Sequence, residues 1–509
     1  MLAVVITGWD GVVLAGYVGL LVCVGWSLSR REARTTKDYF VASRSMPTWA
    51  VAVSILATAQ SAATFMGAPQ QGASGDLRYL LANVGVVIAA VVVSVVFLPA
   101  YFRLNVQTPY ELLERAYGTP VRRMASVWYL GGRLMASGAR VYIGAVPFCL
   151  AVFGEVTGVG LLVCIAGFML FGALFTLASG ARGAIWSDVV QVGVYLGAAV
   201  MLGVVLVWRL PAGDGSVLAR AFAGPGGGGV VIIGELKENW DFSKPFTMLT
   251  AVTGLMLVNL AFFAMDQDLT QRLLSCKSAA HAARSLLLNT VVITLPVVGG
   301  FVLLGMLLSL YFAGPAGSAA SGLPAGTELI TRFAFEHSPV GVAGLMLAGV
   351  LAAGPAGINS SLNAMASSFI NDLYRPLRPG LAEGAYVRAG RVATVVIGVA
   401  MAVFAALCVY WHEASRKSII DFAMGVMVFA YAGLIGVFVA AVVFRRLAWW
   451  SGVGALVVGL GVVVGLQGTG LATPWVLTVG AGVALVVASL GVSFTPEARS
   501  AQRGNDSEG

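Results

Sequence analysis

Thirteen long apolar segments constrain this chain more than any other feature of its sequence. They cover approximately residues 7–29, 48–70, 79–102, 122–153, 157–179, 184–209, 247–266, 284–312, 338–371, 387–410, 419–443, 447–467 and 472–494. A run of ~20 apolar residues is long enough to cross the hydrocarbon core of a bilayer as a helix. With 58% hydrophobic and only 11% charged residues, the chain has little room for a soluble domain. The sequence therefore predicts an all-α membrane protein.

The positive charges indicate how these segments are oriented. If the N-terminus lies outside, the inner connections hold 21 of the 31 lysines and arginines and the outer ones hold eight. Cytoplasmic loops carry such an excess of Lys and Arg. We therefore predict a plasma-membrane protein with a single transmembrane domain at 1–495 and a short cytoplasmic tail at 496–509. The net charge of +8 has the same origin, so we expect no nucleic-acid partner.

The second apolar segment is unusual because its centre is polar. It reads PTWAVAVSILATAQSAATFMGAP from Pro47 to Pro69. Small residues and hydroxyls can serve close packing between membrane helices. They are also typical of a broken helix whose freed backbone groups bind an ion or a substrate. Both interpretations remain open on composition alone.

The seventh segment is also interrupted by polar or flexible residues, at Gly254, Asn259 and Asp266. It opens a second group of five segments (about 247–443), as the second segment opens the first group (about 48–209). Two interrupted helices at corresponding places in two such groups point to the binding site of a transporter. Because five is odd, the two groups would have inverted topology.

The ninth segment has a weak point between Ala353 and Gly357, where Pro355 removes a backbone donor and clashes one turn back. Asn359 and Asn363 follow, four residues apart and therefore on one face. Buried amides need hydrogen-bond partners. These two side chains are expected either to link helices or to form a site facing the second segment.

Three of the charged residues within the segments are Asp188, Arg133 and Arg140. A carboxylate such as Asp188 costs ~2.5–3.5 kcal/mol inside a bilayer, so it usually faces the bundle or a water path. Since Asp188 is close to the cytoplasmic end, an interfacial charge is the alternative. Arg133 and Arg140 are seven residues apart and share a face. We expect structural pairing for both, or a place near the cavity where Arg140 favours an anionic solute.

Five motifs resemble the sodium/solute symporter family. They are DYFVASRSMPTWAVAVSILATAQSAATFMG (38–67), TPYELLERAYG (108–118), SGARGAIWSDVVQ (179–191), DQDLTQRLLSCKS (266–278) and SSLNAMASSFINDLY (360–374). The resemblance implies a LeuT-like core of two inverted five-helix repeats, with one extra N-terminal and two extra C-terminal helices. The family transports sugars, proline, pantothenate, sialic acid and monocarboxylates.

The resemblance also implies a sodium site. Its backbone carbonyls fall on Ala57, Gln60 and Ala353, and its two hydroxyl positions fall on Ala356 and Gly357, so both hydroxyls are missing here. A hard cation prefers about six oxygen ligands. Candidate substitutes, one turn further along, are Ser360 and Ser361.

Other positions acquire roles by the same resemblance. Asp188 matches an acidic residue on the cytoplasmic ion path, and Asn259 and Phe262 match substrate or gate positions. Thr64 stands where a sugar-contacting glutamine is found, so a sugar is not favoured. We place Arg140 with these residues in the substrate cavity.

The expected function is secondary active transport of a small organic solute by alternating access, coupled to sodium. We expect no cofactor other than a sodium ion and no protein partner. A proton-coupled or uncoupled carrier remains an alternative because of Ala356 and Gly357, with Asp188 as the titrating group. A non-transporting membrane sensor is a further alternative. An enzyme is not expected, because no Ser-His or Cys-His set, metal cluster or phosphate loop is evident.

Overall fold

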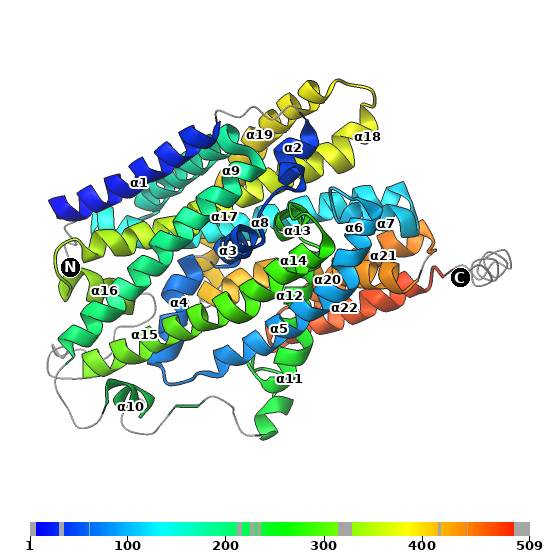
Figure 1. Cartoon of the computed structure of the whole chain (residues 1–509). Coiled ribbons are helices and arrows are strands. Elements are labelled where there is room, and N and C mark those ends of the chain that lie inside the picture. Colours follow the sequence, from blue (N-terminus) through cyan, green and yellow to red (C-terminus); the bar gives the residue numbers. More distant parts are fainter. Residues whose placement is uncertain are drawn as a thin grey trace.

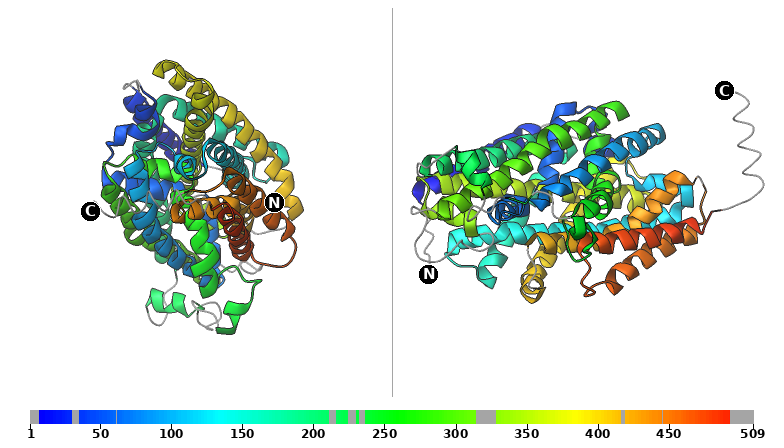
Figure 2. Two further views of the ribbon diagram at one scale, coloured as in Figure 1. Left: turned by 90° about the vertical axis from the view of Figure 1, so that its right-hand side faces the viewer. Right: turned by 90° about the horizontal axis from the view of Figure 1, so that it is seen from below.

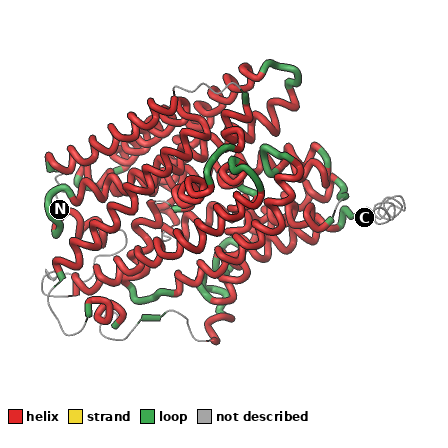
Figure 3. The backbone as a smooth tube through the Cα atoms, viewed as in Figure 1, coloured by secondary structure: helices red, strands yellow, loops and turns green. Residues whose placement is uncertain are grey.

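The structure is a computed structural model that describes residues 7–29, 35–60, 62–210, 216–223, 230–231, 236–313, 328–415, 419–444 and 446–492. Within these ranges the regular structure is helical (Figure 3). The predicted all-α fold class is therefore confirmed. The predicted tail at 496–509 lies outside the described residues.

The helices follow one another with short connections (Figure 1). Their bounds are α1 (Gly8–Ser29), α2 (Thr36–Val41), α3 (Thr48–Ala59), α4 (Ala62–Ala73), α5 (Ala82–Val92), α6 (Leu98–Leu104), α7 (Tyr110–Tyr117), α8 (Thr119–Phe153), α9 (Gly158–Arg209), α10 (Val217–Phe222), α11 (Met248–Thr250), α12 (Met256–Ala264), α13 (Gln267–Leu274), α14 (Ala279–Leu287), α15 (Leu295–Ala313), α16 (Glu328–Glu336), α17 (Val342–Ser368), α18 (Arg375–Leu377), α19 (Glu383–Ser415), α20 (Ile419–Val443), α21 (Trp449–Gly465) and α22 (Thr473–Ser489). Segments of π-helix join several of them, at Val93–Phe97, Ala251–Leu255, Leu288–Thr294 and Phe369–Tyr374.

The long helices lie side by side along one axis of the molecule (Figures 1 and 2). Of the described helices, five are long and apolar enough to cross a membrane, or seven if each of two bent pairs is one span. Five further apolar stretches have 10–17 residues. Together with α8, these elements agree with the thirteen predicted segments.

Helix α9 runs without a gap from Gly158 to Arg209, but it contains two of the predicted segments as the apolar stretches Gly158–Ala173 and Ala181–Arg209. Both halves contact the same part of α17: a Cβ at Gly354 would lie 2.8 Å from the Phe168 ring, and a Cβ at Gly349 would lie 2.7 Å from the Ala198 side chain. A straight helix would separate residues 168 and 198 by about 45 Å, so the chain folds back between them, as two separate segments require.

The second predicted segment is broken, and its two halves, α3 and α4, form an angle of 71°. Gln60 has extended backbone angles (φ −77°, ψ 148°), and its N–H caps α3 by donating to the Leu56 carbonyl. Thr58, Gln60 and Ser61 lie at this point, and such polar residues favour a helix less than the Ala and Leu around them. The break leaves carbonyl groups at the end of α3 without the intrahelical partners they would otherwise have.

The seventh predicted segment is broken as well, between α12 and α13, at an angle of 54°. The break is at Asp266, where the backbone is extended. The Oδ1 atom of Asp266 accepts a hydrogen bond from the N–H of Asp268 at 2.9 Å and so caps the start of α13. The helix is not interrupted at the other two predicted points. Asn259 lies within α12, and Gly254 lies in a π-helical turn where the Pro474 carbonyl leaves no room for a side chain.

The weak point predicted in the ninth segment does not end a helix. Helix α17 continues through residues 353–357. The side chains of Pro355 and Ala356 lie outside the described residues.

Candidate functional site

A small cavity lies where the end of α3 meets α9 and α17. Its lining residues are Leu56, Ala57, Gln60, Gln191, Val192, Tyr195, Ala352 and Ala353. The space in it that is open to the centre of a water molecule is about 10 Å³. About that volume is needed to hold one water, so this cavity has the size for a single small ion or water and not for an organic solute.

The cavity brings together the three predicted carbonyl positions of the sodium site. Ala57 and Gln60 come from the break after α3, and Ala353 comes from α17. The C-terminal end of a helix carries a partial negative charge. The site therefore has the polarity that a cation requires.

Three buried oxygens of the cavity residues have no hydrogen-bond partner among the described residues. They are Oε1 of Gln60, Oε1 of Gln191 and the hydroxyl of Tyr195. Their side chains are 7%, 3% and 3% exposed. Leaving a buried polar atom unsatisfied costs roughly 1–3 kcal/mol, so these oxygens need a partner that the folded chain does not supply.

Asp188 lies one turn before Gln191 on α9. Its Oδ2 accepts hydrogen bonds from Ser54 at 2.5 Å and from Arg272 at 2.9 Å, and Oδ1 has no partner among the described residues. Asp188 is fully buried. It is therefore part of a polar interior and not an interfacial charge.

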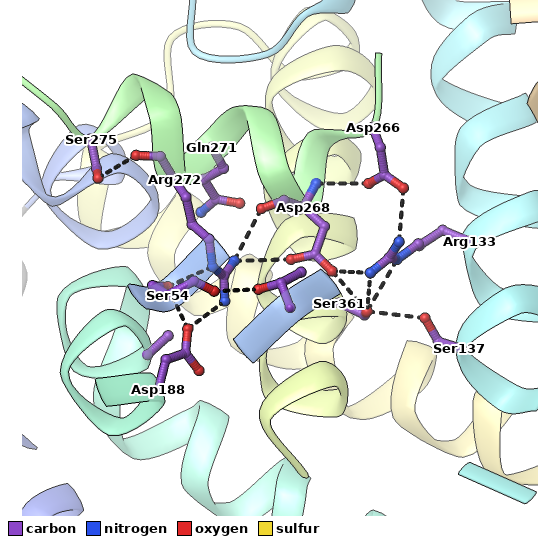
Figure 4. Close-up of polar contacts among 12 residues, drawn as sticks. Ser54, Arg133, Ser137, Asp188, Asp266, Asp268, Gln271, Arg272, Ser275 and Ser361 are labelled. Atoms are coloured by element: carbon purple, nitrogen blue, oxygen red, sulfur yellow. Dashed lines mark hydrogen bonds and ion pairs between the residues drawn. The ribbon is translucent and has the colours of Figure 1, made fainter. Parts of the chain in front are cut away.

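Arg272 and Arg133 extend this contact into a network that spans the bundle (Figure 4). Arg272 contacts Asp268 at 2.9 Å, and Asp268 also contacts Arg133, which lies 2.8 Å from Asp266. Structural pairing, the expectation for Arg133, is what the structure contains. The Tyr431 hydroxyl donates to Asp266, so α20 joins the network as well.

Two guanidinium groups thus face three carboxylates in this network. Asp188, Asp266 and Asp268 are fully buried, and Arg133 and Arg272 nearly so. A third buried guanidinium, that of Arg140, interacts electrostatically with Asp266 and Asp268, so three guanidiniums match the three carboxylates. A buried charge is stable only when it is paired or hydrogen-bonded.

Arg140 lies at the α3 break, beside the network of Arg133, and both guanidiniums lie 5.8 Å from the ring centre of Phe262. The Nη1 atom of Arg140 donates to the Thr58 carbonyl at 3.3 Å. The predicted substrate positions Arg140 and Phe262 are therefore close together.

Thr64, on α4, is half-buried. Asn259 is half-buried too, and its amide donates to its own helix at Leu255.

The predicted substitute ligands have different surroundings. The Ser361 hydroxyl is bonded to Arg133, Ser137 and Asp268, so it belongs to the charged network. The Ser360 hydroxyl is buried without a partner among the described residues. Neither serine lines the small cavity. Gly357 is half-buried, and nothing in the described structure lies within 4 Å of the place a Cβ would take.

Sequence reasoning missed Gln191 and Tyr195 as residues of the cavity, and Asp268 and Arg272 as members of the network. Asp188, Gln191 and Tyr195 are spaced at three and four residues, which places them on one face of α9. Asp268 and Arg272 belong to the charged stretch DQDLTQR, but no pattern in the sequence indicated that these charges would lie in the interior of the bundle after the helix break. Tyr195 looks like any aromatic residue of an apolar helix.

Two broken helices that meet a buried polar site within one helical bundle define a secondary transporter of the LeuT-like class. The sequence profile of the sodium:solute symporter family matches residues 39–461. The chain belongs to this family and is a multi-pass membrane protein. It is a sodium-coupled secondary transporter and not an enzyme.

Two relatives illustrate the match. A sodium/sialic acid symporter of Proteus mirabilis is 26% identical over 452 residues, which cover 88% of this chain and 86% of the relative. A sodium/sialic acid symporter of Aliivibrio fischeri is 26% identical over 434 residues, covering 84% and 82%. These relatives favour neither the proton-coupled or uncoupled carrier nor the sensor.

The fold is shared with solved transporters. A substrate-bound, outward-open sodium-coupled sialic acid symporter, described as having a novel sodium site, aligns with a TM-score of 0.81 and 22% identity. The alignment covers 96% of this chain and 98% of that one. The nucleobase-cation symporter Mhp1 in a closed conformation aligns with a TM-score of 0.55 and 15% identity, covering 91% and 94%.

Proposed function

We propose that this chain couples sodium to the uptake of a small organic anion, with both sites at the break between α3 and α4. One observation carries the proposal. Ala57 and Gln60 line the ion-sized cavity, while the carbonyl of Thr58, between them in the chain, accepts a hydrogen bond from Arg140. A cation at the cavity and an anion at Arg140 would therefore be held by the same short stretch of backbone.

An anionic solute fits the chemistry of this region. Arginine presents a planar set of donors that binds a carboxylate through two parallel hydrogen bonds. The ring of Phe262 beside it offers an apolar face to the rest of the solute. Matched relatives are named for sialic acid, for monocarboxylates and, in a human protein, for iodide. One from Vibrio parahaemolyticus is named for glucose, which is neutral.

Coupling follows if sodium and solute both prefer the same conformation. A ligand shifts a conformational equilibrium only by its difference in affinity between the two states. Sodium at the α3 break would hold the backbone of Thr58, and with it Arg140, in the arrangement that receives the carboxylate. We place the N-terminus outside and the C-terminus in the cytoplasm, in the plasma membrane, from the distribution of lysine and arginine.

The experiment is uptake into liposomes that contain the purified chain. Labelled sialic acid, a short monocarboxylate and glucose are each offered under an inward sodium gradient, with choline replacing sodium as the control. We expect uptake of a carboxylate that requires sodium. Uptake that ignores sodium but follows a pH gradient would favour the proton-coupled carrier. Uptake of glucose alone would contradict the anionic solute.

A further inference from the structure

We infer that two side chains of α9, the amide oxygen of Gln191 and the hydroxyl of Tyr195, complete the sodium site of this chain. They take the place of the hydroxyls that are missing at Ala356 and Gly357. The inference rests on the proposed function, because it takes the cavity beside the α3 break as the sodium site. It adds ligands that the family resemblance does not supply.

The first argument is that three residues with unsatisfied buried oxygens line one small cavity. Gln60, Gln191 and Tyr195 line the same cavity, and an oxygen of each is buried without a partner among the described residues. Three such atoms in one place are too costly to keep unless a common partner binds them. With the carbonyls of Ala57 and Ala353, they approach the number of oxygens that a hard cation takes.

The second argument is the charge around the cavity, which favours a cation over a water molecule. The C-terminal end of α3 directs its partial negative charge to this point. Asp188 is one turn away on the same face of α9, and its Oδ1 is without a partner among the described residues.

The third argument is geometric. Gln191 and Tyr195 are four residues apart on α9, so both project from one face toward the α3 break. The Tyr195 ring packs edge-on against Phe65 of α4 and at a tilt against Phe301 of α15, at 5.3 Å and 5.2 Å between ring centres, and these two rings also contact each other. A ring packed in such a cluster keeps its hydroxyl at a defined place, as an ion ligand requires.

The test measures how sodium raises the melting temperature of the purified full-length chain, at constant ionic strength with choline as the replacement. A ligand at free concentration c that binds only the folded state stabilises it by RT ln(1 + c/Kd), so a weaker Kd requires proportionally more ligand for the same shift. The variants are Tyr195→Phe, which removes only the hydroxyl, and Gln191→Met, which removes only the amide. Tyr17→Phe is the matched control, because that hydroxyl is also buried without a described partner but belongs to α1.

We expect each α9 variant to need about tenfold more sodium for the same shift in melting temperature, as the loss of one ligand to a charge predicts. The control should match the parent chain. A second change, Gly357→Ser, returns a hydroxyl to one of the two positions where the family resemblance expects one. The described structure has nothing within 4 Å of a Cβ at Gly357, so the serine can be accommodated. In the Gln191→Met variant it should restore the response to sodium.

Two results would overturn the inference, and they differ. If the parent chain responds to sodium and both α9 variants respond equally, the sodium site stands, but Gln191 and Tyr195 are not its ligands and the cavity holds water. If the parent chain shows no response specific to sodium, the proposed site itself is wrong and the inference falls with it.

Discussion

Asp188 on α9 and Arg272 on α13 form an ion pair of 2.9 Å in the interior of the bundle, and Ser54 on α3 donates to the same carboxylate oxygen. Three helices that are far apart in the sequence are thus joined at one atom. The pair connects the ion-sized cavity, one turn away at Gln191, to the network around Arg133. Its charges make specific changes predictable.

Arg272→Gln should destabilise the chain far more than Asp188→Asn. The first change leaves Asp188 without a charged partner and removes one of the two partners of Asp268, whereas the second leaves Arg272 still paired with Asp268. Breaking a buried ion pair by removing the partner of a remaining charge costs about 3–5 kcal/mol. The melting temperatures of the two variants in detergent will show the order. Glu336→Gln is the control, because it breaks the partly exposed pair with Arg332. Equal losses would contradict this difference in partners.

Arg140→Lys should raise the KM for a carboxylate solute about tenfold or more and leave kcat less affected. Lysine keeps the charge but loses the paired donors that match a carboxylate. Uptake of the labelled solute as a function of its concentration gives both constants. Arg332→Lys is the control at the protein surface. An unchanged KM would place the solute away from Arg140.

Gly305→Ala should disrupt the contact between α15 and α4. A Cβ at Gly305 would lie 1.8 Å from the Pro69 carbonyl oxygen, which cannot be accommodated without moving a helix. We expect a loss of about 1–3 kcal/mol, seen as a lower melting temperature or a lower yield. Gly299→Ala and Gly300→Ala on the same helix meet nothing within 4 Å and should stabilise α15 by about 0.5–1 kcal/mol each.

Asp76, just before the third span, should make stability depend on pH. The hydrogen bond from the Arg78 side chain holds the pKa of the Asp76 carboxyl below its usual value of ~3.9. A lowered pKa means that the stabilisation is present above the unfolded value and is lost as the pH falls through the folded value.

The Asp76→Asn variant measures this contribution. Its melting temperature should be below that of the parent chain at pH 6, by an amount worth less than about 1 kcal/mol because the pair is partly exposed. The difference should shrink when both chains are melted near pH 3. If the difference in melting temperature grew as the pH fell, the ionised Asp76 carboxylate would not be the stabilising form, and the prediction would be wrong.

Much of the fold could be predicted because apolar length and charge bias are local properties. The breaks near Gln60 and at Asp266 were visible as polar residues within apolar runs. The carbonyl positions Ala57, Gln60 and Ala353 came from resemblance, and they meet at one cavity. Their role as sodium ligands stays a prediction, as do the roles of Asp188, Thr64 and Asn259.

The rest depended on contacts that no local pattern contains. Ser361 looked like a substitute ligand, but its hydroxyl is bonded to Arg133 and Asp268, which lie 228 and 93 residues away in the sequence. Gln191 and Tyr195 belong to the second half of α9. Which face of α9 turns toward the α3 break is decided by packing, so the residues that complete the cavity could not be chosen from the sequence.

The equal numbers of carboxylates and guanidiniums in the bundle interior have an electrical consequence. With Arg140 counted, the three carboxylates of the network are matched by three guanidiniums, so the empty interior carries no formal net charge. Moving one charge through the full membrane potential involves about 2.3 kcal/mol per 100 mV. One sodium ion and one monovalent organic anion would add no net charge, so a carrier that takes up the two together would be driven by the sodium concentration gradient and not by the membrane potential.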